Sequence, residues 1–288
     1  MATQRIIVVG ANGQLGTDLV EVLRQYGEFH VVPLSRQDCD CTVENKIGEL
    51  IVHLHPDVVV NCAAYVRVDE CEEHGSDAFN VNAIGALNVA RACAAANAIC
   101  VYISTDYVFD GTKAAPYAES DLTNPINVYG ASKLAGEYLT RQAVPHWLIV
   151  RTASLFGKTG ARGKGGNFVE TIIKKAKAGE PIGVVDDIRM SPTYSRDLAD
   201  HLTVLLRSRA TGLFHMANGG SCTWYEFART ISEFAALGNP VRSVSSKEFP
   251  AAAVRPKNSA LVTEQHDFQL RDWKDALQAY LIEKGHCC

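Results

Sequence analysis

Near its start the chain reads Ile6-Ile7-Val8-Val9-Gly10-Ala11-Asn12-Gly13-Gln14-Leu15-Gly16. The β-branched run 6–9 predicts a buried strand, and the apolar spacing of Leu15, Leu19, Val22 and Leu23 predicts a helix directly after it. Glycines between the two let the backbone approach a pyrophosphate, which the free amides and positive dipole end of the helix attract. The spacing is GxxGxxG rather than GxGxxG, and a turn that only packs a strand against a helix is the alternative. As the start of a strand–turn–helix unit, the stretch predicts a dinucleotide-binding fold.

The rest of the chain shows a regular alternation. Strand-like apolar runs and helical stretches follow one another at 42–54, 57–61, 78–96, 99–103, 129–143 and 146–150. This alternation is typical of a parallel sheet with helices on both faces. We therefore predict an α/β protein, a Rossmann-type doubly wound parallel sheet with a smaller C-terminal substrate-binding lobe. The dinucleotide-binding domain is expected at 1–155, with a returning segment near 190–210, and the lobe mainly at 156–288.

A second motif, Tyr129-Gly-Ala-Ser-Lys133, follows the triplet Ser104-Thr105-Asp106. A tyrosine and a lysine four residues apart lie on one face of a helix, so their polar ends can converge. The ammonium favours the phenolate and brings the phenol, which normally titrates near pH ~10, closer to the range of an acid–base catalyst. The Thr105 hydroxyl can hydrogen-bond a substrate oxygen. A Tyr–Lys pair alone is common by chance, but downstream of a glycine loop we interpret Thr105, Tyr129 and Lys133 as the catalytic residues.

The adenosine end of the cofactor is expected at the tip of the second strand, where the chain reads Ser35-Arg36-Gln37-Asp38. An acidic residue there holds the ribose 2′-hydroxyl of NAD, whereas a basic one accommodates the 2′-phosphate of NADP. The hydroxyl and the guanidinium come first, which favours NADPH, and Asp38 keeps NADH as an alternative. A solvated turn is the other interpretation of this segment.

The composition argues against several other classes of protein. The formal net charge of −4 over 288 residues gives no electrostatic basis for binding nucleic acid or a membrane. The nine cysteines include no CxxC pair, and without a signal peptide we expect reduced thiols in a cytoplasmic protein. His53 and His55 are two residues apart and would point in different directions on a helix, so we expect no metal site.

Further motifs are spread along nearly the whole chain. They are the loop 10–16, Asn61-Cys-Ala-Ala-Tyr65 with Val68-Asp69, Ser104-Thr-Asp-Tyr-Val-Phe-Asp-Gly111, Pro125-Ile-Asn-Val-Tyr-Gly130, Ser132-Lys-Leu-Ala-Gly-Glu137, Ser191-Pro-Thr193, Trp224-Tyr-Glu-Phe227 and Arg255-Pro-Lys-Asn-Ser259. Together they resemble the dTDP-4-dehydrorhamnose reductase family of the extended short-chain dehydrogenase/reductase superfamily. The string STDYVFDG is far more discriminating than the Tyr–Lys pair, because epimerases of the superfamily usually carry a shorter serine-rich motif there.

The resemblance implies a nicotinamide cofactor and a dTDP-sugar substrate. The residues expected at the cofactor are Gly10, Asn12, Gly13, Gln14, Leu15, Ser35, Arg36, Asp40, Cys41, Ala63, Ala64, Tyr65, Tyr129 and Lys133. Those expected at the substrate are Val68, Thr105, Asp106, Tyr129, Ser154, Asn167 and Arg255. Arg255 would neutralise the diphosphate through bidentate contacts, with a surface ion pair as the alternative. Asn167 would reach the same diphosphate or merely cap the following helix.

One position departs from the family pattern. After the fifth strand these reductases commonly read RTSWVYG, with an aromatic ring near the sugar, whereas this chain reads Arg151-Thr-Ala-Ser-Leu-Phe-Gly157. Ser154 therefore replaces the tryptophan, with Phe156 as a partial substitute. The identity of the sugar and of the nucleotide base stays open.

The expected reaction is the NAD(P)H-dependent reduction of the C4 ketone of a dTDP-6-deoxy sugar, dTDP-4-dehydro-L-rhamnose to dTDP-L-rhamnose, with Tyr129 as general acid. One alternative is a sugar-nucleotide epimerase or dehydratase, since dehydratases need an acidic residue beside the catalytic threonine and Asp106 stands there. The other is a non-catalytic protein similar to the regulatory subunit of methionine adenosyltransferase. Related reductases suggest a homodimer, and the ligands of the interface magnesium that some relatives use cannot be placed in this chain.

Overall fold

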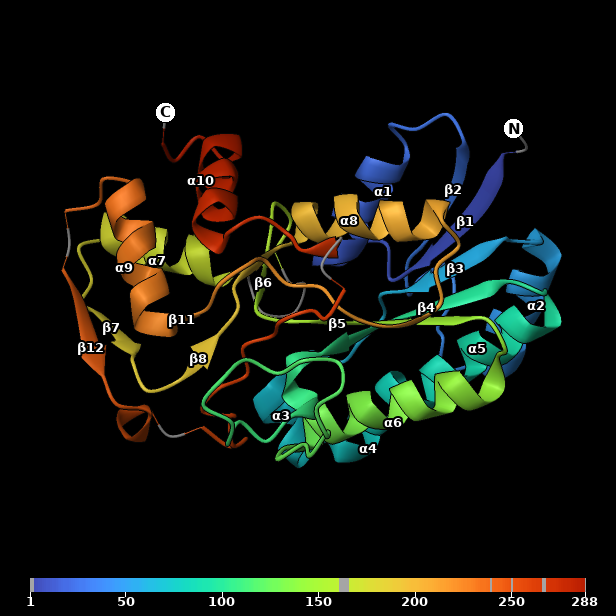
Figure 1. Ribbon diagram of the computed structural model, residues 1–288, viewed down its shortest axis with the longest axis horizontal. Helices are drawn as coiled ribbons and strands as arrows, with labels where there is room; N and C mark the ends of the chain where they lie inside the picture. Colours follow the sequence, from blue (N-terminus) through green and yellow to red (C-terminus); the bar gives the residue numbers. More distant parts are fainter. Residues whose placement is uncertain (1–2, 161–165, 239, 250, 266–267, 288) are drawn as a thin grey trace.

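The computed structural model describes residues 3–160, 166–238, 240–249, 251–265 and 268–287. A large sheet flanked by helices lies beside a smaller lobe (Figure 1). The sheet has the strand order β10-β5-β4-β3-β1-β2, and all neighbouring strands are parallel. Its strands are β1 (Gln4–Val9), β2 (Phe29–Leu34), β3 (Val58–Asn61), β4 (Ile99–Thr105), β5 (Trp147–Thr152) and β10 (Gly212–His215). The order reverses between β1 and β3, as in a doubly wound sheet, which confirms the predicted fold class.

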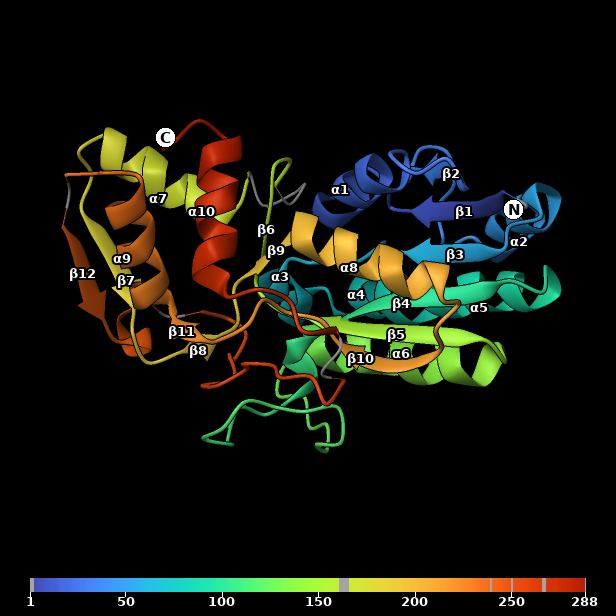
Figure 2. The ribbon, with the colours of Figure 1, turned by 45° about the horizontal axis from the view of Figure 1, so that its top comes forward.

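Strand β1 shows why helices cover both faces of the sheet. Ile6 and Val8 pack in a cluster that includes side chains of α1 (Gln14–Leu23) and α8 (Ser195–Arg207). Ile7 and Val9 pack in another, with side chains of α2 (Glu44–Leu54) and α5 (Gly85–Ala95). Successive strand side chains point to opposite faces, so a continuous apolar run is buried only when both faces are covered. Figure 2 shows the strands side by side, with the carboxyl end of β1 directed toward the lobe.

The predicted strands at 57–61, 99–103 and 146–150 and the predicted helix at 129–143, which is α6 (Val128–Ala143), are confirmed with small shifts at their ends. The helix predicted at 78–96 is instead built from three pieces. They are α4 (Gly75–Phe79), a π-helical turn η1 (Asn80–Ile84) and α5. Such turns often occur at functional sites, and this one buries Asn82 between the loop after β3 and helix α6.

The smaller lobe has its own apolar core, which includes Ile172, Phe227, Ile231, Leu277 and Tyr280. Its elements are α7 (Phe168–Lys177), β7 (Ile182–Val185), β8 (Arg189–Met190), β11 (Cys222–Thr223), α9 (Trp224–Phe234), β12 (Val241–Val244), η3 (Ser246–Glu248) and α10 (Trp273–Glu283). Helix α9 begins with a capping box, in which Thr223 and Glu226 satisfy each other's backbone amides. The lobe therefore has its own packing and does not depend only on contacts with the sheet.

Two short strands, β6 (Leu155–Phe156) and β9 (Thr193–Tyr194), pair in parallel where the chain leaves and re-enters the sheet region. After β9 the chain returns through α8, which packs on α1, and through β10, which pairs with β5. Helix α8 and strand β10 are therefore part of the sheet region. The division of the chain into domains near residue 155 stays a prediction. None of the described helices has the length and apolar character needed to cross a bilayer.

Candidate active site

A cavity of about 710 Å³ opens at the carboxyl ends of β1, β3, β4 and β5, where they face the lobe. This is the edge at which open parallel sheets bind ligands. Its lining contains all three predicted catalytic residues, every predicted cofactor residue except Ser35, and every predicted substrate residue except Arg255. The predicted residues that line it are Gly10, Asn12, Gly13, Gln14, Leu15, Arg36, Asp40, Cys41, Ala63, Ala64, Tyr65, Val68, Thr105, Asp106, Tyr129, Lys133, Ser154 and Asn167.

The glycine loop forms a close-packed cradle between β1 and α1. Gly10 has a φ of +77°, and a Cβ there would lie 2.8 Å from the backbone nitrogen of Ala63. A Cβ on Gly16 would collide with the carbonyl oxygen of Gly10, so helix α1 begins against the loop. No side chain caps the first turn of α1, and the buried Oε1 of Gln14 has no hydrogen-bond partner. Free amides and an unpartnered polar atom beside this cradle fit the pyrophosphate and ribose of a dinucleotide.

The loop after β3 forms the neighbouring wall, and the π-helical turn holds it in place. Asn61 Oδ1 accepts a hydrogen bond from the amide of Ala63 at 3.1 Å. Asn82 Oδ1 accepts one from the amide of Tyr65 at 2.8 Å, and Asn82 Nδ2 donates to Ser132 Oγ at 2.9 Å. Asn82, which lies within the π turn, therefore connects this loop to α6, the helix that carries Tyr129 and Lys133.

At the expected adenosine end, Arg36 and Asp40 line the cavity and Ser35 does not. The Ser35 hydroxyl and amide both donate to Asp38 Oδ2, at 2.6 and 2.8 Å, so the serine closes a turn. The Arg36 side chain is 80% exposed, and its Nε lies 3.0 Å from Asp40 Oδ2. An exposed pair of this kind contributes little stability, so the guanidinium is free to turn toward a 2′-phosphate. A cofactor contact by Ser35 stays a prediction that the geometry does not support.

Thr105 ends β4 and Tyr129 lies in the first turn of α6, and both side chains line the cavity, where the Thr105 hydroxyl influences the pKa of the phenol. The Thr105 hydroxyl also donates to Asp106 Oδ1 at 2.9 Å and accepts the amide of Tyr107 at 3.2 Å. Burial raises the pKa of Tyr129, and the contact with Thr105 opposes this only in part. The expectation of a lowered phenol pKa is therefore wrong, because desolvation outweighs the other influences. The phenol stays protonated at neutral pH, the state needed in a proton donor.

Lys133 is 2% exposed, and its Nζ donates to the carbonyl oxygen of Ile103 at 2.6 Å. The ammonium also lies 4.1 Å from the ring centroid of Tyr102. Burial lowers the pKa of Lys133 to about 7, and the negative charge of Glu137 opposes the change. The lysine thus lines the cavity on the same helix face as Tyr129, but its hydrogen bond is to strand β4.

Asp106, the first residue of the 3₁₀ turn η2 (Asp106–Val108), is buried at the cavity wall. Burial raises the pKa of its carboxyl to about 6, against hydrogen bonds from Ser259 and Thr105. Its Oδ2 has no hydrogen-bond partner. A buried carboxyl with a free oxygen at a cavity wall can accept a substrate hydroxyl, because an unmet buried acceptor is costly.

The lobe supplies an aromatic wall that we did not expect in this form. Phe168 and Trp224 meet edge to face, with ring centroids 4.7 Å apart, and both line the cavity with Phe227. Ser154 stands where the family pattern has a tryptophan. Its backbone has a φ of +42°, in the left-handed region. Only the motif around Trp224 could have been read from the sequence, because Phe168 carries no distinctive signal.

The two residues predicted to bind the diphosphate, Asn167 and Arg255, have partners within the protein. Asn167 caps α7 by accepting the amide of Glu170 at 3.0 Å, and its Nδ2 donates to Gly157 O and Tyr280 Oη at 2.7 and 3.0 Å. Arg255 forms a bidentate ion pair with Asp69, with Nη2 2.6 Å from Oδ2, and holds the pKa of that carboxyl down at about 2. Both residues adopt the alternatives named above, and their ligand roles stay predictions. Among the described residues, no cluster of histidine, cysteine or carboxylate side chains could hold a metal ion.

A doubly wound sheet whose glycine loop shares one cavity with a threonine, a tyrosine and a lysine defines an oxidoreductase of the short-chain dehydrogenase/reductase class. The family model described as the RmlD substrate binding domain matches residues 4–285. The chain therefore belongs to the dTDP-4-dehydrorhamnose reductase family.

Individual relatives agree with this assignment. The chain is 37% identical over 99% of both chains to the spore coat polysaccharide biosynthesis protein SpsK of Bacillus subtilis. It is 40% identical to the dTDP-4-keto-6-deoxy-D-glucose reductase of Streptomyces niveus, over 90% of this chain and 88% of that one. The crystal structure of the Bacillus anthracis dTDP-4-dehydrorhamnose reductase with NADP superposes with a TM-score of 0.93, at 40% identity, and covers 98% of this chain and 99% of that one.

Proposed function

We propose that the protein reduces the C4 ketone of a dTDP-linked 6-deoxy sugar with NADPH, NADH being the alternative cofactor, and that dTDP-4-dehydro-L-rhamnose is the substrate. The observation that carries the proposal is the single cavity that joins the dinucleotide cradle at Gly10 to Thr105, Tyr129 and Lys133. The names of the relatives support the substrate class, and the NADP in the Bacillus anthracis structure supports the cofactor.

The residues divide the work as follows. The bound nicotinamide supplies a hydride. Tyr129, kept protonated by burial, donates the proton to the oxygen that becomes the alcohol. Thr105 contacts the phenol and orients the carbonyl oxygen beside it. Lys133 holds the nicotinamide ribose, and Asp106 offers its free carboxylate oxygen to a sugar hydroxyl.

The test is a stoichiometric assay with the proposed substrate, dTDP-4-dehydro-L-rhamnose (dTDP-4-keto-6-deoxy-L-mannose). A reductase consumes one reduced cofactor per sugar, whereas an epimerase or dehydratase recycles its cofactor and a regulatory protein does neither. Asp106 is the feature that keeps the dehydratase alternative worth testing, because its carboxyl is buried next to Thr105 with a pKa of about 6. Oxidation of NADPH without a reduced sugar, or a sugar change without net oxidation, would contradict the proposal.

The nucleotide is tested separately, by calorimetric titration with dTDP, UDP and GDP. We expect dTDP to bind most tightly, and equal binding of UDP would leave only a broader sugar-nucleotide reductase. A homodimer, which sedimentation velocity would measure, belongs to the same proposal. So does a cytoplasmic location, with which the free cysteines of the described residues agree.

A further inference from the structure

Four side chains form a buried row that leads from the cavity into the interior. Lys133, Glu137, Arg151 and His215 are exposed by 2%, 3%, 5% and 1%. Lys133 and Glu137 lie one turn apart on the same face of α6. Glu137 Oε2 and Oε1 accept hydrogen bonds from Arg151 Nη2 and Nε at 2.7 and 2.9 Å, and Arg151 Nη1 lies 3.4 Å from His215 Nε2. None of these residues except Lys133 belongs to the catalytic set described above.

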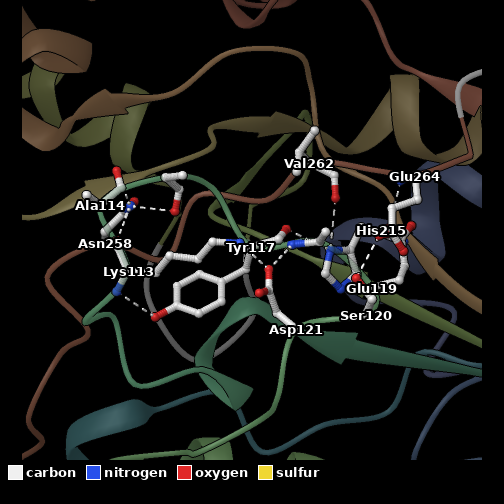
Figure 3. A network of polar contacts seen from close by, with 12 residues as sticks. Lys113, Ala114, Tyr117, Glu119, Ser120, Asp121, His215, Asn258, Val262 and Glu264 are labelled. Carbon is white, nitrogen blue, oxygen red and sulfur yellow. Dashed lines mark hydrogen bonds and ion pairs between the residues drawn. The ribbon is translucent and has the colours of Figure 1, made fainter.

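The far end of this row carries no charge. His215 Nδ1 lies 3.1 Å from the carbonyl oxygens of both Tyr117 and Val262, so Nδ1 carries the hydrogen and Nε2 faces Arg151 as an acceptor. Burial lowers the pKa of His215 against the charge of Glu119, whose carboxylate accepts the His215 amide. Figure 3 shows the His215 ring beside Tyr117, Val262 and Glu119. The charges in the row are therefore those of Lys133, Glu137 and Arg151.

The near end carries a cation with few polar partners. The groups beside Lys133 are the carbonyl of Ile103 and the ring of Tyr102 on β4, and the thiols of Cys62 and Cys41, while Tyr129 lines the same cavity one turn earlier on α6. Burial raises the pKa of Cys62 to about 12 and that of Cys41 to about 11, and it raises those of both tyrosines, so all four groups are neutral near pH 7. Glu137 is the carboxylate that acts on Lys133.

Glu137 is also tied to strand β4, which presents Thr105. Ser104 Oγ donates to Glu137 Oε1 at 2.5 Å, and Ser104 directly precedes Thr105. The carboxylate of Glu137 therefore joins its own helix α6, which carries Tyr129 and Lys133, to the end of β4 through Ser104 and to β5 through Arg151. A buried carboxylate that is fully hydrogen-bonded stays in one place.

We propose that Glu137 is a positioning residue of the active site, which holds Lys133 in its ammonium form and fixes β4 against α6, while Arg151 balances its charge. The inference rests on the proposed function only in its effect on turnover. Burial lowers the pKa of Lys133, and the charge of Glu137 opposes this. Without the carboxylate the pKa should fall further, so the ammonium would lose its proton at lower pH. An opposite charge nearby shifts a buried group by about one to three pH units.

The direct test titrates Lys133 in cofactor-free protein labelled with ¹³C at the lysine Cε, with Lys133→Arg to assign the resonance. In Glu137→Gln we expect the midpoint to fall by about one pH unit or more. The matched control is Asp197→Asn. Asp197 forms a similar bidentate pair with Arg271, at 2.6 and 2.8 Å, on helix α8 and outside the cavity lining. An unshifted midpoint in Glu137→Gln, or an equal shift in Asp197→Asn, would overturn the proposal.

Turnover gives the second readout. The alkaline limb of the pH profile of kcat/KM should move to lower pH in Glu137→Gln, and the affinity for NADPH should begin to fall at lower pH than in the unmodified protein. If Glu137→Gln does not fold, Glu137→Gln with Arg151→Met removes both charges and avoids a lone buried guanidinium. Glu137 acts on Lys133 and Arg151 does not, so the double variant should shift the Lys133 midpoint in the same direction, and an unshifted midpoint would overturn the proposal. A protein that reduces no dTDP-keto sugar would refute the proposed function, while the titration would still decide the role of Glu137.

Discussion

The two walls of the cavity differ in the chemical groups that they present. The wall on the sheet side consists of strand ends, where Gly10, Ala63 and Thr105 present backbone and small polar groups. The wall on the lobe side is aromatic, with Phe168 and Trp224 at the first turns of α7 and α9. The sheet wall can hold phosphates and move protons, whereas the lobe wall offers apolar surface for a sugar or base. We infer that chemistry and substrate discrimination are divided between the walls, and the following variants test that division.

The largest effect is expected on the sheet wall. Tyr129→Phe removes the proposed proton donor and should lower kcat by about 10²–10⁴-fold while NADPH binding stays near normal. The measurement is steady-state turnover together with cofactor titration by fluorescence. Tyr138→Phe, at an exposed position of the same helix, is the control and should leave both unchanged. Retention of most of the activity by Tyr129→Phe would show that the tyrosine is structural.

The next effect concerns the adenosine end of the same wall. Arg36 should contact the 2′-phosphate, and a charge-assisted contact gives NADPH about a tenfold to hundredfold advantage over NADH. Arg36→Ala should remove this preference and leave NADH kinetics almost unaltered. Arg91→Ala removes a comparably exposed ion pair, with Glu44, on α5 and serves as the control. If the unmodified protein uses both cofactors equally well, Arg36 does not read the phosphate.

A smaller effect is expected on the lobe wall. Trp224→Ala removes a ring worth about 0.5–1.5 kcal/mol in aromatic contacts, so KM for the keto sugar should rise by about twofold to tenfold. Affinity for NADPH should not change. Tyr225→Ala removes the next aromatic residue of α9, which does not line the cavity. A larger loss of cofactor binding than of substrate binding in Trp224→Ala would break the division between the walls.

The smallest effect is expected where the walls meet. Ser154 has a φ of +42°, a left-handed conformation that glycine adopts without strain. Ser154→Gly should raise the free energy of unfolding by about 1 kcal/mol or less, because relief of strain exceeds the added chain entropy. Urea denaturation measures this, with Arg209→Gly, at a φ of +52°, as a matched site outside the cavity lining. A less stable Ser154→Gly would mean that the serine side chain makes contacts that outweigh its strain.

Local patterns were sufficient for the sheet wall. The run 6–9 with its glycines predicted the first strand, the cradle and the helix, because the constraints on such a turn involve only neighbouring residues. The spacing of Tyr129 and Lys133 correctly placed both on one helix face. The break of the helix at Asn80–Ile84 was not predicted, because the π turn depends on Asn82 reaching Tyr65 and Ser132 from other elements.

Contacts between distant residues account for what the sequence could not supply. The polar groups of Asn167 and Arg255 suggested ligands, yet their partners Tyr280 and Asp69 lie far away along the chain. The direction of the Tyr129 pKa shift follows from burial, which no spacing reveals. The sequence places Glu137 one helical turn after Lys133, but only the fold brings Ser104 and Arg151 to its carboxylate.

By itself the amino-acid sequence determined the parallel sheet, the glycine loop and the choice of Thr105, Tyr129 and Lys133 as the residues proposed to be catalytic, because strand period, glycine conformation and helix spacing act within a few residues. The tertiary structure alone decided the protonation of those side chains, the partners of each charge and the aromatic wall. These depend on desolvation and on groups from other strands and helices, because the pKa of a buried group is set by its burial and by the charges and hydrogen bonds around it.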